Sequence, residues 1–216
     1  MKKVVIATAA VLALSLSSAF AVTAQTGVFV TGGAGIGQMD SPTSGFSAYP
    51  TYSYKNFGFA WNSGIGYQQA LNQNFSVGLE LGYGQLAKGS FSFNDGAGTS
   101  VDVDIKNTAW QLLANATYLW NNGFNVFVNA GGARVKQDVT ATVDGISGPS
   151  DKTQTRFVAG LGLGYQFTQS FGTNISLLHV FGKDYSNLAD ISGVSNVAVA
   201  TSNTFTLNLV YTFPTM

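Results

Sequence analysis

The chain of 216 residues has no cysteine, a single histidine and few charged side chains, which make up only 9% of it. Soluble domains carry about 25% charged residues, so this composition does not suit a surface that faces water on all sides. Without cysteine, thiol catalysis and thiolate metal sites are excluded. The 10 basic residues are balanced by 10 acidic ones and form no cluster, which argues against a nucleic-acid partner.

Glycine and aromatic residues are abundant instead, with 26 glycines, 16 phenylalanines and 9 tyrosines. With 45% hydrophobic residues the chain is too apolar for a disordered protein. Read in steps of two, bulky side chains alternate with Gly, Ser, Asn and Gln over 57–68, 75–84, 157–167 and 205–213. A period of two is typical of β-strands and not of helices.

Residues 1–24 predict a secretory signal peptide. Two lysines precede an apolar run over 4–16, and the small residues that follow offer cleavage after Ala21 or after Ala24. An N-terminal membrane helix is the alternative, but such a helix needs ~20 apolar residues and this run is shorter. We therefore expect an exported chain whose residues 25–216 form one domain.

Breaks in the alternation divide the mature chain into hairpins. Short polar breaks fall near 71–73, 121–123 and 168–170. Longer stretches rich in Ser, Thr, Asp, Gly and Pro lie at about 39–55, 88–100, 138–152 and 184–200. The pattern predicts eight antiparallel strands in four hairpins, with tight turns and both termini at one end and long loops at the other.

The tight turns themselves are predicted from the rule that residues paired across a hairpin share one face of the sheet. Three-residue turns place Trp120 opposite Phe124 and Phe167 opposite Phe171, all on the bulky face, and they put Gly123 in the left-handed position that such turns need. Large aromatic residues thus gather in a girdle near the tight-turn end: Tyr67, Phe75, Trp120, Phe124, Phe167, Phe171 and Phe213.

Two closed barrels fit the alternation, a soluble one with the bulky face inside and a membrane one with the bulky face outside. The face opposite the bulky one consists of Gly, Ser, Asn and Gln with almost no charge. A soluble barrel would carry Lys and Glu on its outside, whereas a narrow membrane barrel can fill its interior with small polar residues and place aromatic girdles at the membrane boundary. Closure also leaves no strand edge exposed to lipid. The sequence therefore predicts a transmembrane barrel.

With this pattern and the terminal run over 205–213, the mature chain resembles the eight-stranded outer-membrane barrels of the OmpA/OmpX type and the opacity-like surface proteins. The resemblance implies an all-β, antiparallel, up-and-down transmembrane β-barrel in the outer membrane of a Gram-negative cell. It also implies a monomer in contact with outer-membrane lipid and lipopolysaccharide. In that family the barrel-assembly machinery reads an aromatic end of the last strand, which here corresponds to Tyr211 and Phe213, although Pro214 and two further residues follow.

Counting residues upward from the tight turns predicts a polar layer inside the barrel, made of Glu80, Asn115, Asn129, Ser176 and Asn208. The nearest cations, Arg134, Arg156 and Lys106, lie about 12 Å or more above Glu80 at the rise and tilt of barrel strands. A buried carboxylate without donors is costly, so we expect the amides, hydroxyls and trapped water to hold it. The alternative is a Glu80 carboxylate that is simply hydrated in an open lumen.

Three other motifs resemble functional sites and are better explained structurally. The run 32–37 contains a Gly spacing that departs from dinucleotide-binding turns and is not followed by an amphipathic helix. His179 lacks the serine that lipid A deacylases place two residues later, and we expect it near the outer rim. Asp102 and Asp104 form a solvated rim, with a strand bulge or a strand end predicted near 106–108. We therefore predict no catalytic residue, cofactor or metal ligand.

Three functions remain open for such a barrel. The first is a surface protein that supports the envelope and binds a host or cell-surface ligand through four extracellular loops. The second is a narrow channel or carrier for small or apolar solutes, suggested by Leu113, Leu119 and Phe127 on the inner face. The third is a lipid A-modifying enzyme. The fold alone does not choose between them.

Overall fold

The computed structural model describes residues 22–39, 51–94, 100–143, 146–182 and 199–215, so the predicted signal peptide up to Ala21 lies outside the described residues. The strands are β1 (Gly27–Met39), β2 (Thr51–Lys55), β3 (Phe57–Ala70), β4 (Phe75–Asn94), β5 (Ser100–Leu119), β6 (Phe124–Val143), β7 (Ile146–Gln166), β8 (Phe171–Val180) and β9 (Ser202–Pro214). No stretch of these residues forms a helix long and apolar enough to cross a membrane.

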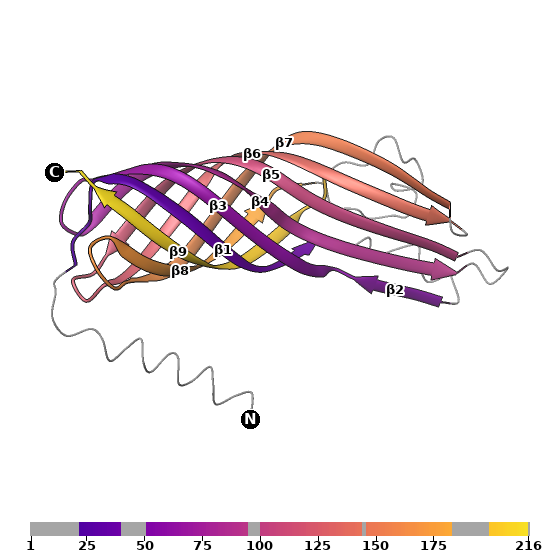
Figure 1. Ribbon diagram of the computed structural model, residues 1–216, viewed down its shortest axis with the longest axis horizontal. Helices are drawn as coiled ribbons and strands as arrows, with labels where there is room; N and C mark the ends of the chain where they lie inside the picture. The colour runs from indigo at the N-terminus through magenta and orange to yellow at the C-terminus, as the bar shows by residue number, and fades with distance from the viewer. Residues whose placement is uncertain (1–21, 40–50, 95–99, 144–145, 183–198, 216) are drawn as a thin grey trace, which may run out of the picture.

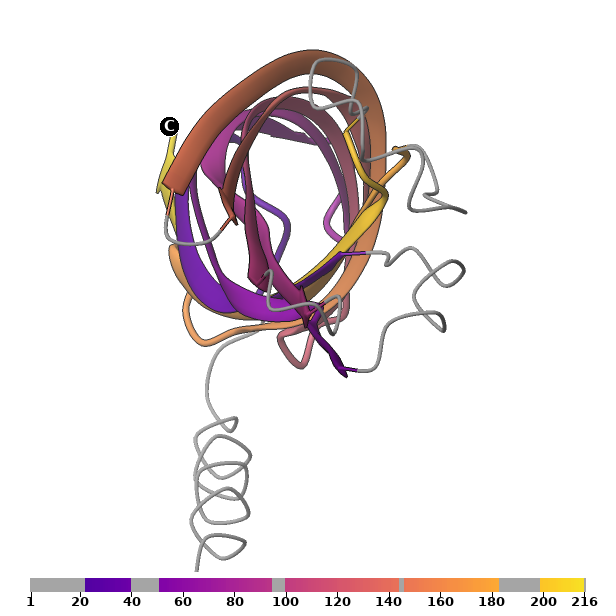
Figure 2. The same cartoon turned by 90° about the vertical axis from the view of Figure 1, so that its right-hand side faces the viewer.

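The strands form one closed antiparallel sheet (Figures 1 and 2). Strand β1 pairs with β3 and β9, β3 pairs with β4, each strand from β5 to β9 pairs with the next, and the β4–β5 pairing completes the ring. Strands β2 and β3 both pair with β4 and are separated by Asn56 alone, so together they occupy a single position in the ring. The fold is therefore the predicted eight-stranded up-and-down barrel, with the first and last described residues at the tight-turn end.

The tight turns have the predicted form. The Trp120 amide donates to the Phe124 carbonyl at 2.8 Å, and the Phe167 amide donates to the Phe171 carbonyl at 2.9 Å, which confirms both three-residue turns. Gly123 has φ of 87°, the left-handed conformation that favours glycine.

Two of the four predicted long loops, at about 88–100 and 138–152, are wrong, because most of their described residues belong to strands. Strands β4 and β5 stay paired up to Asn94 and Ser100, and β6 and β7 stay paired up to Val143 and Ile146. Ser, Thr and Gly in these segments form regular strands because the two strands of each hairpin supply backbone partners to each other. Strands β4 to β7 therefore form a wall that extends beyond β1, β3, β8 and β9 at the loop end, with β2 paired to the upper part of β4 (Figure 1), and we call this part the tall wall.

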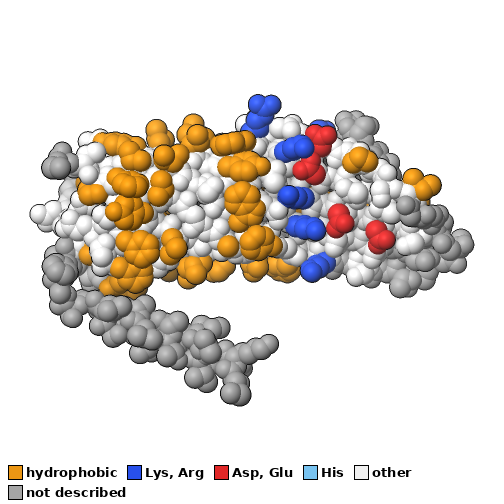
Figure 3. All heavy atoms as spheres, in the orientation of Figure 1, with side chains coloured by type: hydrophobic (Ala, Val, Ile, Leu, Met, Phe, Trp, Pro, Cys, Tyr) orange, Lys and Arg blue, Asp and Glu red, His pale blue; other side chains and the backbone are white. Residues whose placement is uncertain are grey.

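On the face seen in Figure 3, hydrophobic side chains gather over the lower part of the barrel, most densely in two bands, one near the tight-turn end and one farther up. The bulky face points outward, as predicted: Leu79, Leu163 and Leu207 are 60%, 65% and 57% exposed. A second aromatic girdle, which the sequence analysis did not identify, lies at the upper edge of this apolar region: Phe57, Phe59, Trp61, Tyr83, Trp110, Phe157, Phe181 and Phe205. Trp110 and Trp120 on β5 are ten residues apart, or about 25 Å at the rise and tilt of barrel strands, which matches a bilayer core.

Above the upper girdle, the apolar side chains of the wall point into the barrel and the polar ones point outward, which is the reverse of the arrangement below the girdle. On β5, Val103, Ile105 and Ala109 are buried inside, whereas Asp102 and Asp104 are exposed outside. A bulge lies at the predicted level, but in the neighbouring strand: the extra residue of β4 lies opposite Asn107 and Thr108, whereas β5 itself pairs with β6 without a break in register. The apolar residues change phase there because the outer solvent changes from lipid to water.

On β4 the same inversion is achieved by the backbone. The register between β4 and β5 shifts between Gln85 and Ala87. Odd-numbered residues of β4 point outward below this bulge, as Leu79 does, and inward above it, where Phe91 is only 4% exposed. On β5 the apolar residues change from even-numbered to odd-numbered positions, whereas on β4 the bulge turns the odd-numbered residues inward. In both strands the apolar side chains therefore point into the barrel above the upper girdle.

We predict that Leu79→Arg destabilises the barrel by about 2 to 4 kcal/mol, because Leu79 faces lipid midway between Phe75 and Tyr83. Thr140→Arg is the matched control, since Thr140 is exposed on the outer face of β6 above the upper girdle and lies opposite Asp104, and its effect should stay within about 0.5 kcal/mol. Urea unfolding in lipid vesicles measures both values. Equal stability of Leu79→Arg and wild type would contradict the assignment of faces.

Candidate functional site

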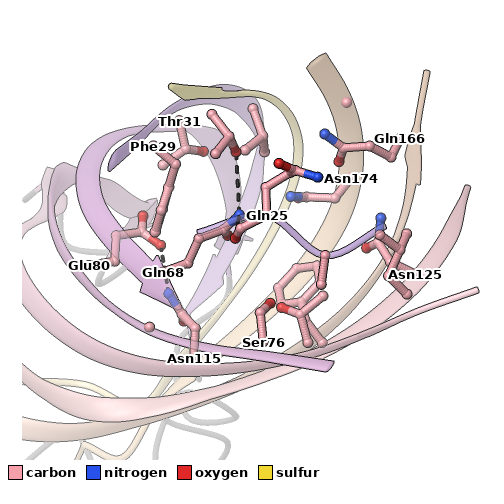
Figure 4. A pocket seen from close by; sticks show the side chains of 18 of the residues that line it. Gln25, Phe29, Thr31, Gln68, Ser76, Glu80, Asn115, Asn125, Gln166 and Asn174 are labelled. Carbon is pink, nitrogen blue, oxygen red and sulfur yellow. Dashed lines mark hydrogen bonds between the residues drawn. The ribbon is translucent and has the colours of Figure 1, made fainter. Parts of the chain in front are cut away.

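The lower half of the barrel encloses a polar cavity that begins at the tight-turn end. Its walls carry amide, hydroxyl and carboxylate groups from every part of the ring (Figure 4). The rings of Phe29 and Phe127 also line it, and a second cavity continues upward past Glu80 and Asn129. This upper cavity ends beneath the apolar side chains of Leu86, Leu113 and Leu178. The lumen is therefore polar below and closed above by hydrocarbon.

Glu80 lies between the two cavities and lines both. The Asn115 amide on the neighbouring strand β5 donates to its carboxylate at 3.3 Å. Arg134 points outward, on the face shared with Trp110, whereas Arg156 points inward and donates to Gln154. Within the described residues, the protein supplies Glu80 with a neutral amide donor and no basic partner.

Of the other members of the predicted layer, Asn129 lies opposite Asn115 on β6 and its side-chain oxygen has no hydrogen-bond partner among the described residues. Ser176 and Asn208 belong to a separate group on β8 and β9. The Asn208 amide donates to Asn174 at 2.8 Å and to Ser176 at 3.0 Å, and the Ser176 and Thr206 hydroxyls are 2.8 Å apart. Strands β8 and β9 lie across the ring from β4 and β5. Asn115 is thus the one predicted neighbour that bonds Glu80 directly, because the width of the lumen separates the two walls.

The chain before β1 lies at the lower mouth of the cavity. Thr23, Ala24 and Gln25 line the cavity, and the Ala24 amide donates to the Gln73 carbonyl at 2.8 Å. The Gln68 side chain donates to the Gln25 carbonyl at 3.2 Å. This segment narrows the lumen from below and is visible beside Gln68 in Figure 4.

The upper lumen is filled by an apolar plug made of side chains from five strands and from the chain just before β9. Its members are Leu86, Ala109, Leu113, Ala133, Val135, Val158, Val180 and Val199, all no more than 5% exposed. A second cluster lies above it and contains Met39, Ala87, Phe91, Val103, Ile105, Val139 and Ala200. Side chains thus occupy the space that looks open between the ribbons in Figure 2.

The β4 bulge fixes the plug by bringing β4 against strands that are not its neighbours in the sheet. The Thr204 hydroxyl of β9 donates to the Leu86 carbonyl at 2.7 Å. Gly37 of β1 lies so close that a Cβ there would be 2.0 Å from the same carbonyl oxygen. The Leu86 backbone therefore crosses the lumen, and β1 accommodates it only because residue 37 has no side chain.

Among the described residues, some buried polar groups around the plug are paired, whereas the Asn107 amide and the Ser202 hydroxyl have no hydrogen-bond partner. Gln137 is only 1% exposed and accepts from the Ala200 amide at 3.1 Å. Gln154 accepts from the Val199 amide at 3.3 Å and also from Arg156. These bonds anchor the chain that enters β9 to the inner walls of β6 and β7.

The structure also places the remaining predicted residues. The lower-girdle aromatics line the outside of the tight-turn end, and the rings of Tyr211 and Phe213 lie 4.8 Å apart on the outer face of β9. His179 lies on the outer face of β8, bonds Asn203 at 2.8 Å and contacts the Phe181 ring. The glycine-rich run 32–37 is part of β1. The assembly role of Tyr211 and Phe213 stays a prediction.

The sequence contained one signal for the plug. The apolar residues of β5 change phase between Ile105 and Trp110, and a strand that leaves the membrane for water must show such a change. A bulge or strand end in β5 was the predicted reason, whereas the change of solvent is the reason in the structure. Residues such as Leu86 and Gly37 gave no comparable signal, because their contact joins parts of the chain that are far apart in sequence.

We predict a direct energetic coupling between Glu80 and Asn115. In a double-mutant cycle with Glu80→Ala and Asn115→Ala, the coupling should be about 1 to 2 kcal/mol, since hydrogen bonds to charged groups are stronger than neutral ones. Glu80→Ala combined with Ser176→Ala is the control and should be additive within about 0.5 kcal/mol. Additive effects in the first cycle would show that the carboxylate is simply hydrated.

We also predict that Gly37→Ala destabilises the protein by about 1 to 3 kcal/mol, because the new methyl group would overlap the Leu86 carbonyl. Gly32→Ala on the same strand is the matched control, since a Cβ at Gly32 would meet nothing within 4 Å. Unfolding midpoints in vesicles compare the two variants. If both behave as wild type, β1 and the β4 bulge are not in contact.

Comparison with known proteins agrees with this geometry. The family model described as outer membrane protein beta-barrel domain matches residues 6–213. No curated protein matches the sequence. Among solved structures, the attachment invasion locus protein Ail of Yersinia pestis is similar over 88% of this chain and 100% of its own, with 14% identity and a TM-score of 0.52.

The complex of Ail with the heparin analogue sucrose octasulfate gives the same coverage and identity and a TM-score of 0.53. The outer membrane protease OmpT of Escherichia coli covers 88% of this chain and 99% of its own, with 10% identity and a TM-score of 0.48. At these identities the similarity shows the fold alone. Because the family model spans nearly the whole chain, the protein belongs to the family of outer membrane protein beta-barrel domains.

Proposed function

We propose that this outer-membrane barrel is a surface protein that supports the envelope and attaches the cell to a host or cell-surface ligand through its four extracellular loop regions. The apolar plug is the observation that carries the proposal. Leu86, Val135, Val158 and Val180 are each no more than 2% exposed and interrupt the lumen above the polar cavity. Solutes that enter the lower cavity therefore meet packed hydrocarbon and not a pore.

The tall wall supports a role at the cell surface. From Trp110 to Ser100, β5 continues for ten residues above the upper girdle, or about 25 Å at the same rise and tilt. The outer face of the tall wall carries exposed hydroxyl and carboxylate groups, such as those of Asp102 and Asp104 on β5 and of Thr140 on β6. A rigid, hydrogen-bonded sheet of this height presents its tip to partners beyond the membrane.

The carrier hypothesis has less support. Leu119 and Phe127 line the lower cavity, but Leu113 belongs to the plug, and the residues of the plug are packed against one another. An enzymatic role would need a nucleophile and a base within hydrogen-bond reach, whereas the partner of His179 is an asparagine on the outer face. No enzymatic activity is proposed.

The proposal includes a signal-peptide cleavage site for export and an aromatic signal for assembly. Cleavage of the signal peptide after Ala21 fits better than cleavage after Ala24, because it keeps the Ala24 amide that bonds Gln73. Tyr211 and Phe213 are 43% and 53% exposed on the last strand, so the barrel-assembly machinery can reach both rings. The protein is then inserted as a monomer.

The test compares attachment with conductance. A bacterial strain that displays the protein should adhere to epithelial cells, and deletion of 141–148, which shortens the β6–β7 hairpin, should reduce adhesion about tenfold if the tall wall supplies a binding energy of ~1.4 kcal/mol or more. The purified protein should give no porin-like current steps in planar bilayers. Gly148→Ala controls for surface display, since a Cβ at Gly148 would meet nothing within 4 Å. Large current steps together with wild-type adhesion of the deletion variant would contradict the proposal.

A further inference from the structure

Among the described residues, Glu80 is the one charged side chain inside the membrane-spanning part of the barrel. It lines both luminal cavities and is only partly buried, so its carboxylate is open to whatever fills them. No lysine or arginine of the described chain pairs with it. A charge at this depth is costly without a counter-charge, and the lumen therefore favours a cation.

Only one oxygen of this carboxylate has a hydrogen-bond donor among the described residues. Asn115 donates to Oε2, whereas Oε1 lies over Gly64, in the place that a Cβ of this residue would need. The next inward position of β3 is Gly66, and the ring of Phe29 covers it. Two such positions are about 7 Å apart, so the carboxylate and the ring lie next to each other, as Figure 4 shows.

Two aromatic rings face the lumen near Glu80. Phe29 lies opposite Gly66, which in turn lies opposite Glu80. Phe127 of β6 lines the same two cavities as Glu80. The face of an aromatic ring attracts a cation, and the ring also offers a large apolar surface. One carboxylate with two rings thus provides a counter-charge and an apolar contact in the same space.

This combination suits an alkylammonium ion better than a metal ion. The described residues contain no group of three or more acidic, histidine or cysteine side chains that could hold a metal, and Ca²⁺ takes six to eight oxygen ligands, which often include several carboxylates. A primary ammonium group donates up to three hydrogen bonds, and its single charge neutralises one carboxylate. Its alkyl stem needs the apolar contact that the rings provide.

A ligand reaches Glu80 from the tight-turn end, because the apolar plug closes the lumen above. In such barrels the short turns face the periplasm. The lower cavity has a volume of about 120 Å³. A single water molecule needs about 10 to 15 Å³ on this measure, so an amine of about five heavy atoms fits.

We propose that the lower cavity binds a small primary amine. The ammonium group pairs with Glu80, and the alkyl stem lies against the rings of Phe29 and Phe127. The plug keeps the amine from crossing the membrane, so the cavity is a binding site and not a channel. The site lies at the opposite end of the barrel from the tip of the tall wall, and the inference does not depend on the adhesive role.

The test titrates n-butylammonium chloride into the mature chain refolded in phosphatidylcholine vesicles and follows binding by calorimetry. Wild type should bind this probe, and Glu80→Gln should bind it at least about tenfold more weakly, because the charge-assisted hydrogen bond is lost. Phe29→Leu should bind it about threefold more weakly, because the ring no longer attracts the cation. Without the probe, urea should unfold Glu80→Gln no earlier than wild type, since an unpaired charge is removed. This measurement separates lost binding from poor folding.

Asp104→Asn is the matched control, because Asp104 is an exposed carboxylate on the outer face of β5, and it should keep wild-type affinity. n-Butanol has the same alkyl chain without the charge and should not bind. Potassium chloride at the same concentration should not displace the amine. Unchanged affinity of Glu80→Gln would overturn the proposal. Displacement by potassium would also overturn it, since the site would then accept any monovalent cation.

Discussion

The lipid core of a membrane offers no hydrogen bonds, so every backbone amide that crosses it needs a partner in the protein. This constraint closes the sheet through the β4–β5 pairing and keeps it regular from one girdle to the other. The irregular features lie near or beyond the upper girdle: the break at Asn56, the bulge between Gln85 and Ala87, and the unequal strand ends. Water can serve the backbone there, and the strands are free to bend and end.

The same boundary determines where side chains point. Between the girdles, lipid surrounds the barrel, so bulky residues face outward and small polar residues fill the lumen. Above the upper girdle, water surrounds it, and the apolar residues move inside to form the plug. On β5 the apolar residues move to the inward-facing positions of the sequence, whereas on β4 the bulge turns the strand so that its apolar residues point inward. The lower part of the barrel thus has the side-chain arrangement of a membrane barrel, and the upper part has that of a barrel surrounded by water. The charged residues of the described chain other than Glu80 lie in the girdle region or above it.

The plug interrupts the lumen, so the tall wall is the larger described surface that a partner outside the membrane can reach. In the polar cavity below, the Asn115 amide donates to the Glu80 carboxylate. The residues of the predicted layer do not all contact one another: Ser176 and Asn208 lie on the opposite wall and Asn129 on β6. A residue count along strands gives height but not the distance across the lumen.

The sequence by itself determined the architecture, the turn types, the outward face and the height of Glu80, because strand periodicity, Gly123 and the girdle aromatics are local features that one solvent boundary explains. The tertiary structure alone decided that 88–94 and 138–143 are strand, that the bulge belongs to β4, and that Leu86 crosses the lumen to Gly37 and Thr204. These outcomes depend on contacts between residues far apart in the chain. Such contacts form only when the ring closes, and no local pattern records them.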